Sequence, residues 1–171
     1  MRKIILTTLA LLLALLIAGC GGSGKSSGLL RSEARLEGMY EACRHVEISD
    51  PAGARPTIES DELRGFPRID VTTKLKRSNG MEYPGTWSGA RLSEVLAEHG
   101  VGDDFQELRF IAWDDYAARV SHDIAMRADT ILAYEQDGEE LPREQGPMRL
   151  VVGSEDGFYW ILMIVRIEIV R

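Results

Sequence analysis

The sequence predicts one β-rich domain of the α+β class. Three observations support this prediction: the length that remains after an N-terminal signal, a strand-like alternation in the middle of the chain, and one isolated helical pattern among several strand-like runs. Removal of the first 19 of the 171 residues leaves 152, which is close to the common size of a single domain. A chain of that length buries enough surface to fold without a disulfide.

The clearest strand signal begins at Arg68. Residues of one parity are apolar or small, and those of the other parity are polar: Ile69, Val71, Thr73 and Leu75 against Asp70, Thr72, Lys74 and Lys76. Such alternation is typical of a strand with one buried face. Arg77, which follows the run, has the parity of the buried face.

Other segments complete the expected arrangement. A helix is expected over residues 88–100, because Leu92, Val95, Leu96 and His99 recur at helical spacing and Gly100 suits a C-terminal cap. A short helix is expected within residues 29–45, and the Asp-Pro-Ala-Gly run at 50–53 predicts a turn. The remaining expected elements are strands at 107–113, 118–124, 130–135, 148–153 and 159–170, with a hairpin turn at Asp137-Gly138.

The N-terminus predicts export and attachment to a membrane. Arg2 and Lys3 precede an apolar run at 4–17 that is short for a membrane span. The following Ile-Ala-Gly-Cys at 17–20 resembles the lipobox of bacterial lipoproteins, which implies diacylation of Cys20; the alternative is an ordinary secretory signal with an incidental cysteine. We therefore expect a signal peptide at 1–19, lipidated Cys20 with a flexible linker to residue 36, and a domain at 37–171. The mature protein would be anchored in the cell envelope outside the cytoplasm.

The mature chain is acidic. The full chain has 20 Lys and Arg residues and 27 Asp and Glu residues. Two of the basic residues and none of the acidic ones lie in the expected signal, so the mature chain has 18 basic and 27 acidic side chains and a net charge of −9. Nucleic acid is a poor partner for such a charge.

One cysteine remains once Cys20 carries a lipid. Cys43 then has no partner for an internal disulfide. It is expected to act as a small buried apolar residue, the alternative being a reactive thiol or a metal ligand.

An ordered series of motifs runs through the second half of the chain. They read Trp87-Ser88-Gly89, Arg91-Leu92-Ser93-Glu94-Val95-Leu96, Asp115-Tyr116, Ile131-Leu132-Ala133-Tyr134-Glu135, Asp137-Gly138, Leu141-Pro142, Gly146-Pro147-Met148-Arg149-Leu150-Val151-Val152 and Arg166-Ile167-Glu168-Ile169. Together they resemble the molybdopterin-binding domain of sulfite-oxidase-like oxidoreductases. The resemblance implies that fold for residues 37–171 and makes molybdopterin the cofactor to consider.

Two positions depart from the family pattern. The resemblance implies a metal-binding cysteine at the end of the strand before the Trp-x-Gly motif, and Arg77 stands there. Arginine stays protonated and has no lone pair for a metal. A lysine that the family uses to hold the pterin phosphate corresponds to Leu162, and a neighbouring tryptophan to Met163. We therefore expect a retained scaffold that binds no cofactor, with molybdopterin binding as the alternative.

Five residues form the candidate ligand pocket: Arg77, Asn79, Asp115, Tyr116 and Arg149. The planar guanidinium of Arg77 suits two-point binding of a small anion. Alternatively, Arg77 pairs with a carboxylate such as Asp115, and nearby lysines form a solvated face.

Three functions stay open on the sequence. The chain is expected to be a non-catalytic lipoprotein that binds a small anionic ligand or an envelope protein. The alternatives are a molybdopterin-dependent oxidoreductase with an atypical metal attachment, and a structural or assembly subunit.

Overall fold

The computed structural model describes residues 23–76, 79–153 and 159–171, with side chains from residue 31 onward. The chain forms two compact units, residues 1–33 and residues 34–171. Both sheets and the candidate site belong to the second unit, which is a single β-rich α+β domain.

Helix α1 spans Ser23–Ala42. A helix was expected within residues 29–45, but the observed helix starts earlier, inside the expected flexible linker, and continues across the expected domain boundary at residue 37. Leu, Arg, Glu and Ala favour helix over residues 29–42, whereas the Ser- and Gly-rich residues 23–28 into which the helix extends have no such preference, and nothing in their sequence explains the extension. Among the described residues, no helix combines the length and apolar character needed to cross a membrane. The expected signal peptide and Cys20 lie outside the described residues.

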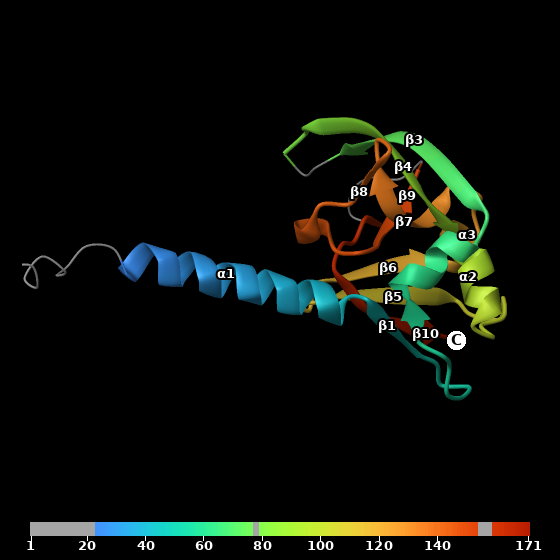
Figure 1. Ribbon diagram of the computed structural model, residues 1–171. Helices are drawn as coiled ribbons and strands as arrows, with labels where there is room; N and C mark the ends of the chain where they lie inside the picture. Colours follow the sequence, from blue (N-terminus) through green and yellow to red (C-terminus); the bar gives the residue numbers. More distant parts are fainter. Residues whose placement is uncertain (1–22, 77–78, 154–158) are drawn as a thin grey trace, which may run out of the picture. The chain divides into compact units, whose positions relative to one another are not determined.

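The first sheet has the strand order β2-β1-β10-β5-β6. Its strands are β1 (His45–Ser49), β2 (Ile58–Glu59), β5 (Glu107–Ala112), β6 (Ala117–Ser121) and β10 (Ile164–Val170). Strand β1 runs parallel to β10, and the other pairs are antiparallel. Figure 1 shows β1, β5, β6 and β10 lying together below the other strands.

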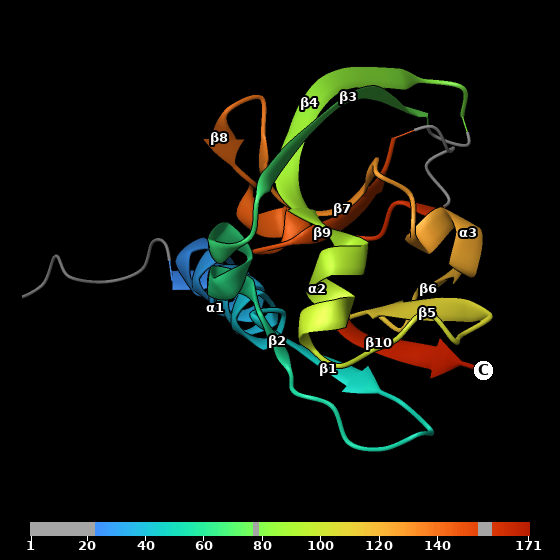
Figure 2. The same ribbon diagram turned by 90° about the vertical axis from the view of Figure 1, so that its right-hand side faces the viewer.

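The second sheet has the order β3-β4-β7-β8, and β9 also pairs with β7. Its strands are β3 (Arg68–Lys76), β4 (Glu82–Arg91), β7 (Thr130–Gln136), β8 (Glu139–Glu140) and β9 (Arg149–Val152). The alternation predicted for β3 is confirmed, since Val71 is buried and the polar parity is exposed. Figure 2 shows β3 and β4 as a long curved ribbon above β7 and β9.

Short helices connect the strands. They are α2 (Leu92–Glu98), α3 (His122–Ala125), and the 3₁₀ turns η1 (Ser60–Gly65) and η2 (Arg143–Gln145). The helix predicted over residues 88–100 is too long, because its first four residues extend β4 and pair with β3 and β7. The strand predicted at 118–124 ends at Ser121, where α3 begins. The strand predicted at 159–170 begins only at Ile164, after Met163 adopts a positive φ of 53°.

Both predicted turns are present. Asp137 and Gly138 have φ angles of 54° and 86°, as a two-residue hairpin requires, and they join β7 to β8. At the other turn, the Asp50 carboxylate accepts a hydrogen bond from the Ala52 backbone N–H at 2.9 Å. The side chain of Asp50 therefore stabilises the turn that follows β1.

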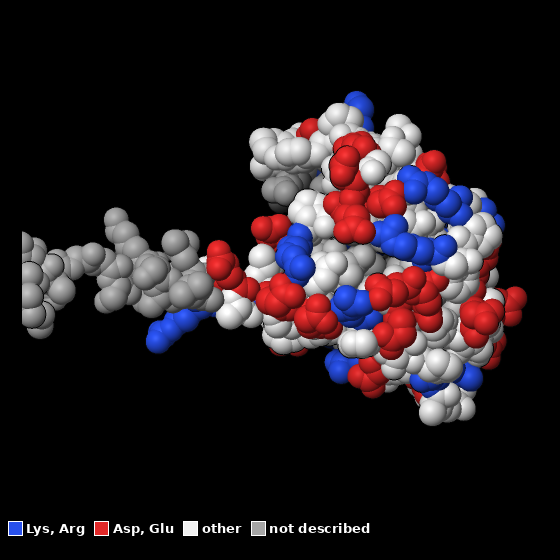
Figure 3. All heavy atoms as spheres, viewed as in Figure 1, with Lys and Arg blue, Asp and Glu red and all other residues white. Residues whose placement is uncertain are grey.

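Basic and acidic side chains pair on the surface of the second unit. Arg64 donates to Glu135 at 2.9 Å and to Glu140 at 3.0 Å, and Arg68 donates to Asp70 at 3.0 Å. Figure 3 shows Lys and Arg side chains interleaved with Asp and Glu side chains on one face. Arg64 and Arg68 are therefore paired with acids, and basic side chains on the face in Figure 3 lie among acidic ones.

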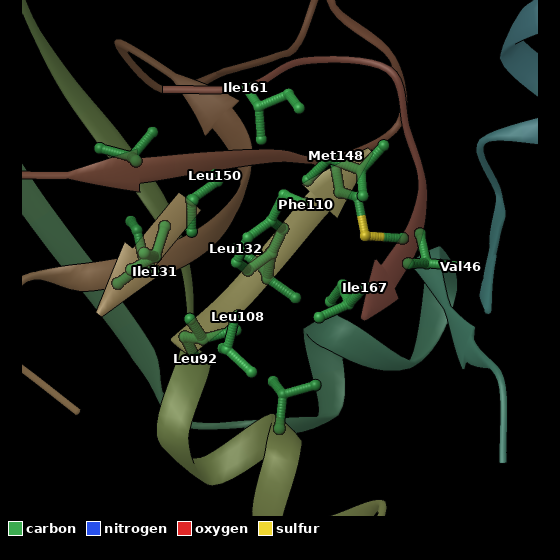
Figure 4. Packing of buried hydrophobic residues seen from close by; sticks show 14 of the residues in the cluster. Val46, Leu92, Leu108, Phe110, Ile131, Leu132, Met148, Leu150, Ile161 and Ile167 are labelled. Atoms are coloured by element: carbon green, nitrogen blue, oxygen red, sulfur yellow. The ribbon is translucent and has the colours of Figure 1, made fainter. Parts of the chain in front are cut away.

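The two sheets and α2 share one apolar core. Figure 4 shows Phe110 of β5, Leu132 of β7 and Ile167 of β10 lying close together. All three side chains are fully buried. Cys43 is also fully buried, with its Sγ 3.7 Å from the Sδ of Met163, which confirms the expected small buried residue. Burial raises the pKa of the Cys43 thiol to about 11.

Candidate ligand-binding site

A cleft of about 180 Å³ lies beside the end of the β3–β4 hairpin. Its lining comes from β3, β4, β7, β9 and the segments before and after β9: Leu75, Tyr83, Trp87, Gln136, Gln145, Arg149 and Leu162. We call it the arginine cleft. Leu75 and Tyr83 face each other across the hairpin, as register partners of β3 and β4.

Arg149 is a buried cation in this lining. It begins β9, where it pairs with Ala133 of β7 and forms a bridge with Leu162. Only 4% of its surface is exposed. Its guanidinium donates to the amide oxygen of Gln145 and lies 5.5 Å from the centre of the Trp160 ring. These contacts hold the charged group in one place, as ligand binding by an arginine requires.

Trp87, which also lines the arginine cleft, carries an unsatisfied donor. Its side chain is 1% exposed, and its indole Nε1 has no hydrogen-bond partner among the described residues. Its ring packs edge-on against Trp160, with 4.7 Å between centroids, but the Nε1 of Trp160 donates to the Val152 carbonyl at 2.9 Å. A buried N–H that lacks an acceptor lowers the stability of the fold. The Nε1 of Trp87 is such a donor, whereas the Nε1 of Trp160 has its acceptor.

A second cleft, of about 340 Å³, adjoins the first at Leu162. Its lining joins the β5–β6 turn to the segment after Tyr159: Ala112, Asp114, Tyr116, Trp160, Ile161 and Leu162. We call it the aromatic cleft. In the turn, Asp115 adopts a φ of 65°, and the Asp114 carboxylate accepts a hydrogen bond from the Tyr116 N–H at 3.2 Å. Asp115 is therefore a turn residue.

The structure brings two of the five predicted pocket residues to these clefts. Arg149 lines the arginine cleft and Tyr116 lines the aromatic cleft. Asn79 and Asp115 line neither: the Asn79 side chain accepts a hydrogen bond from the Met81 N–H at 3.0 Å, within the β3–β4 turn, and Asp115 is exposed beside Asp114. Arg77 lies outside the described residues.

The structure also shows where the lysines of β3 and the residues Leu162 and Met163 lie. Lys74 and Lys76 occupy the exposed parity of β3, opposite to Leu75, and Lys74 donates to Glu82 at 3.0 Å. They form the solvated face that was expected as the alternative to an anion-binding cluster around Arg77. Leu162 and Met163 differ in position, since Leu162 lines both clefts whereas Met163 is buried against Cys43.

The sequence analysis missed Trp87, Gln145 and Asp114 as lining residues. Trp87 belonged to a recognised motif, but nothing in that motif signalled an unsatisfied N–H. Among the described residues, no group of three or more His, Cys, Asp or Glu side chains is placed to hold a metal ion.

Comparisons with known proteins agree with this architecture. The family model described as the oxidoreductase molybdopterin binding domain matches residues 45–171. The mitochondrial sulfite oxidases of Homo sapiens and Mus musculus are 29% and 30% identical to the chain over an alignment covering 73% of it and 28% of each of those proteins. The chain therefore spans less than a third of the length of these relatives.

A solved structure has the same fold. The crystal structure of the sulfane dehydrogenase SoxCD from Paracoccus pantotrophus superposes with a TM-score of 0.65 at 24% identity, covering 74% of this chain and 38% of that one. Together with the family match, this similarity confirms the predicted sulfite-oxidase-like molybdopterin-binding fold.

Proposed function

The chain belongs to the family of oxidoreductase molybdopterin binding domains, and from that premise we propose that it is a membrane-anchored envelope protein whose arginine cleft binds a small anion without molybdenum chemistry. The main support for this anion site is the Nε1 of Trp87, which is buried and has no hydrogen-bond partner among the described residues.

An anion would satisfy the donors of the arginine cleft. The Nε1 of Trp87 has no acceptor among the described residues, and the guanidinium of Arg149 is held nearby in the same lining. A carboxylate or another oxyanion accepts hydrogen bonds from both N–H types, and charge-assisted bonds of this kind are stronger than neutral ones. The amides of Gln136 and Gln145 offer further donors.

The residues of the cleft do not fit a molybdenum held by a protein thiolate. Cys43 is the only cysteine after Cys20, and none follows it. Its thiol is buried beside Met163, burial raises its pKa to about 11, and it belongs to neither cleft lining. On the described part of β3, the residue that reaches the arginine cleft is Leu75, which has no donor atom. The proposed function therefore includes no redox step at this site.

The envelope location rests on the N-terminal sequence. Residues 17–20 have the pattern of a lipoprotein processing site, and Cys20 would carry the lipid. Acyl chains contribute about 0.8 kcal/mol for each buried methylene, so several chains on one cysteine give stable anchoring. Labelling of cells with a radioactive fatty acid, with Cys20→Ser as the unlabelled control, tests this part of the proposal.

Protein purified after export is expected to contain far less than one molybdenum per chain. The reason is that no thiolate of this chain is available in the cleft. Elemental analysis measures the metal, and fluorescence of the oxidised pterin measures the organic part of the cofactor. An endogenous molybdenum enzyme from the same cells serves as the control for cofactor supply. Stoichiometric molybdenum would contradict the proposal and would favour an oxidoreductase with an atypical metal attachment.

Acetate binding is expected to weaken about tenfold in Trp87→Phe, because the variant lacks one hydrogen bond to a charged group, worth about 1.5 kcal/mol. Isothermal titration calorimetry measures the change. Trp113→Phe is the matched control, since Trp113 is 43% exposed and lines neither cleft.

Two further variants complete that titration. If Trp87→Phe unfolds, Arg149→Lys replaces it, because lysine keeps the charge but loses the planar fork. Arg77→Ala tests whether Arg77 contributes to acetate binding, in which case the variant binds acetate more weakly than the wild type. Equal binding by the wild type, Trp87→Phe and Arg149→Lys would rule out an anion site here, and no binding by the wild type would favour a structural or assembly subunit.

A further inference from the structure

The two clefts differ in the sign of their charge and meet at the side chain of Leu162. The lining of the arginine cleft includes Arg149, a buried cation, and Trp87, whose indole N–H is unsatisfied, whereas the aromatic cleft is lined by Asp114 and, within the described part of the chain, by no basic residue. Leu162 belongs to both linings and is 38% exposed. A ligand that crosses Leu162 would therefore meet positive and donor groups at one end and negative charge at the other.

The backbone sets the distance between the chain segments that carry the two ends. Arg149 forms a bridge with Leu162, and on the other side the Trp113 N–H donates to the Met163 carbonyl at 2.8 Å. Residue 149, residues 162–163 and residue 113 thus lie on three neighbouring chain segments. Because neighbouring paired segments are about 5 Å apart, the two outer segments are separated by about 10 Å.

The aromatic cleft suits an organic cation. Asp114 supplies a carboxylate that accepts a hydrogen bond from the Tyr116 N–H, and Tyr116, which is 48% exposed, supplies an aromatic ring. Carboxylates pair with ammonium groups, and aromatic faces attract cations.

We propose that the two clefts together bind one dipolar ligand, with its carboxylate in the arginine cleft and its ammonium group in the aromatic cleft. This inference rests on the proposed anion site. An α-amino acid carries both charges on one carbon, too close together to reach both clefts. About 10 Å corresponds to three extended residues. The ligand class is therefore a short peptide with free ends, or an ω-amino acid, whose chain crosses Leu162.

The test compares 8-aminooctanoate, whose extended chain separates its two charges by about 10 Å, with octanoate, which has the same chain but no ammonium group. Isothermal titration calorimetry with the wild-type protein is expected to show about fivefold tighter binding of 8-aminooctanoate. In Asp114→Asn this preference is expected to disappear while octanoate binding stays unchanged. Asparagine keeps the acceptor for the Tyr116 N–H, so the turn is preserved. Asp115→Asn is the matched control, because Asp115 lies outside the lining and asparagine tolerates its positive φ.

The results distinguish failure of the dipolar-ligand inference from failure of the proposed anion site. Equal binding of 8-aminooctanoate and octanoate by the wild type, or a preference that survives Asp114→Asn, would overturn the dipolar ligand and leave the anion site standing. If neither octanoate nor acetate binds, the anion site itself fails. If Asp114→Asn proves unstable on thermal unfolding, Tyr116→Ala, which removes the ring, is expected to reduce the same preference, and an unchanged preference there would overturn the inference.

Discussion

Replacement of Gly89 by alanine is expected to lower the free energy of unfolding by at least about 3 kcal/mol. An added Cβ at this position would lie 2.1 Å from the Leu132 carbonyl oxygen and 2.6 Å from the Cα of Ala133. Both are backbone atoms of β7, so no side-chain rotation can relieve the clash. Relief would require β4 and β7 to separate in the middle of the second sheet.

The local strand pairing explains why glycine is needed at this position. The register of β4 against β7 shifts between Ser88 and Gly89, as at a β-bulge. Bulges bring two backbones into close approach, and a glycine marks such places because it has no side chain. Trp87, two residues earlier, lines the arginine cleft, so loss of this pairing would also displace the proposed anion site.

Thermal and urea unfolding followed by circular dichroism measure the effect of Gly89→Ala. For a domain of this size the loss corresponds to a fall in Tm of about 10 °C. Gly65→Ala is the control, because a Cβ there would meet nothing within 4 Å and the φ of Gly65 is ordinary. A Gly89→Ala protein as stable as the Gly65→Ala protein would contradict the observed β4–β7 packing.

The fold was predictable where one local pattern agreed with the tertiary pairing. The alternation after Arg68 predicted β3 correctly, because one face of β3 packs on the core and the other meets solvent. The helix predicted from residue 88 failed at its start, since residues 88–91 extend β4 between β3 and β7. Pairing with two neighbouring strands outweighed the helical spacing of the residues that follow, and local sequence does not reveal such partners.

The site was predictable only in part, for a related reason. Arg149 and Tyr116 came from motifs of a recognised family, and both line clefts. The role of Trp87 depends on which acceptors lie near its Nε1, and that is a property of the assembled core. Trp160 has the same side chain but finds the Val152 carbonyl. The sequence alone does not distinguish these two tryptophans.

Asp50 joins the turn after β1 to Arg171, next to the end of β10, through a buried carboxylate. Its side chain has 0% exposure and accepts hydrogen bonds from Arg55 at 2.8 Å and from Arg171 at 2.9 and 3.1 Å. Arg171 also pairs with Asp104, in the loop before β5. The cluster therefore fastens the C-terminal end of β10 to the turn after its parallel neighbour β1. The hydrogen bonds from Arg171 are the main reason why the pKa of Asp50 lies well below its usual range.

Asp50→Asn is expected to cost about 2 kcal/mol of stability at pH 7, because hydrogen bonds between charged partners become bonds to a neutral amide. The cost should depend on pH. An unfolded Asp has a pKa of about 3.9, and the folded pKa of Asp50 is lower. The carboxylate therefore stabilises the fold fully above about pH 4, and this contribution declines as the pH falls toward the folded pKa.

Urea unfolding of the wild type and Asp50→Asn at pH 7, 5 and 3 measures this dependence. The difference in the free energy of unfolding should be equal at pH 7 and pH 5 and smaller at pH 3. Asp103→Asn makes the same charge change at an exposed carboxylate next to Asp104 and is expected to cost less than about 0.5 kcal/mol. A difference between the wild type and Asp50→Asn that grows on acidification would contradict the lowered pKa, because only a carboxyl group whose folded pKa is raised gains stability in acid.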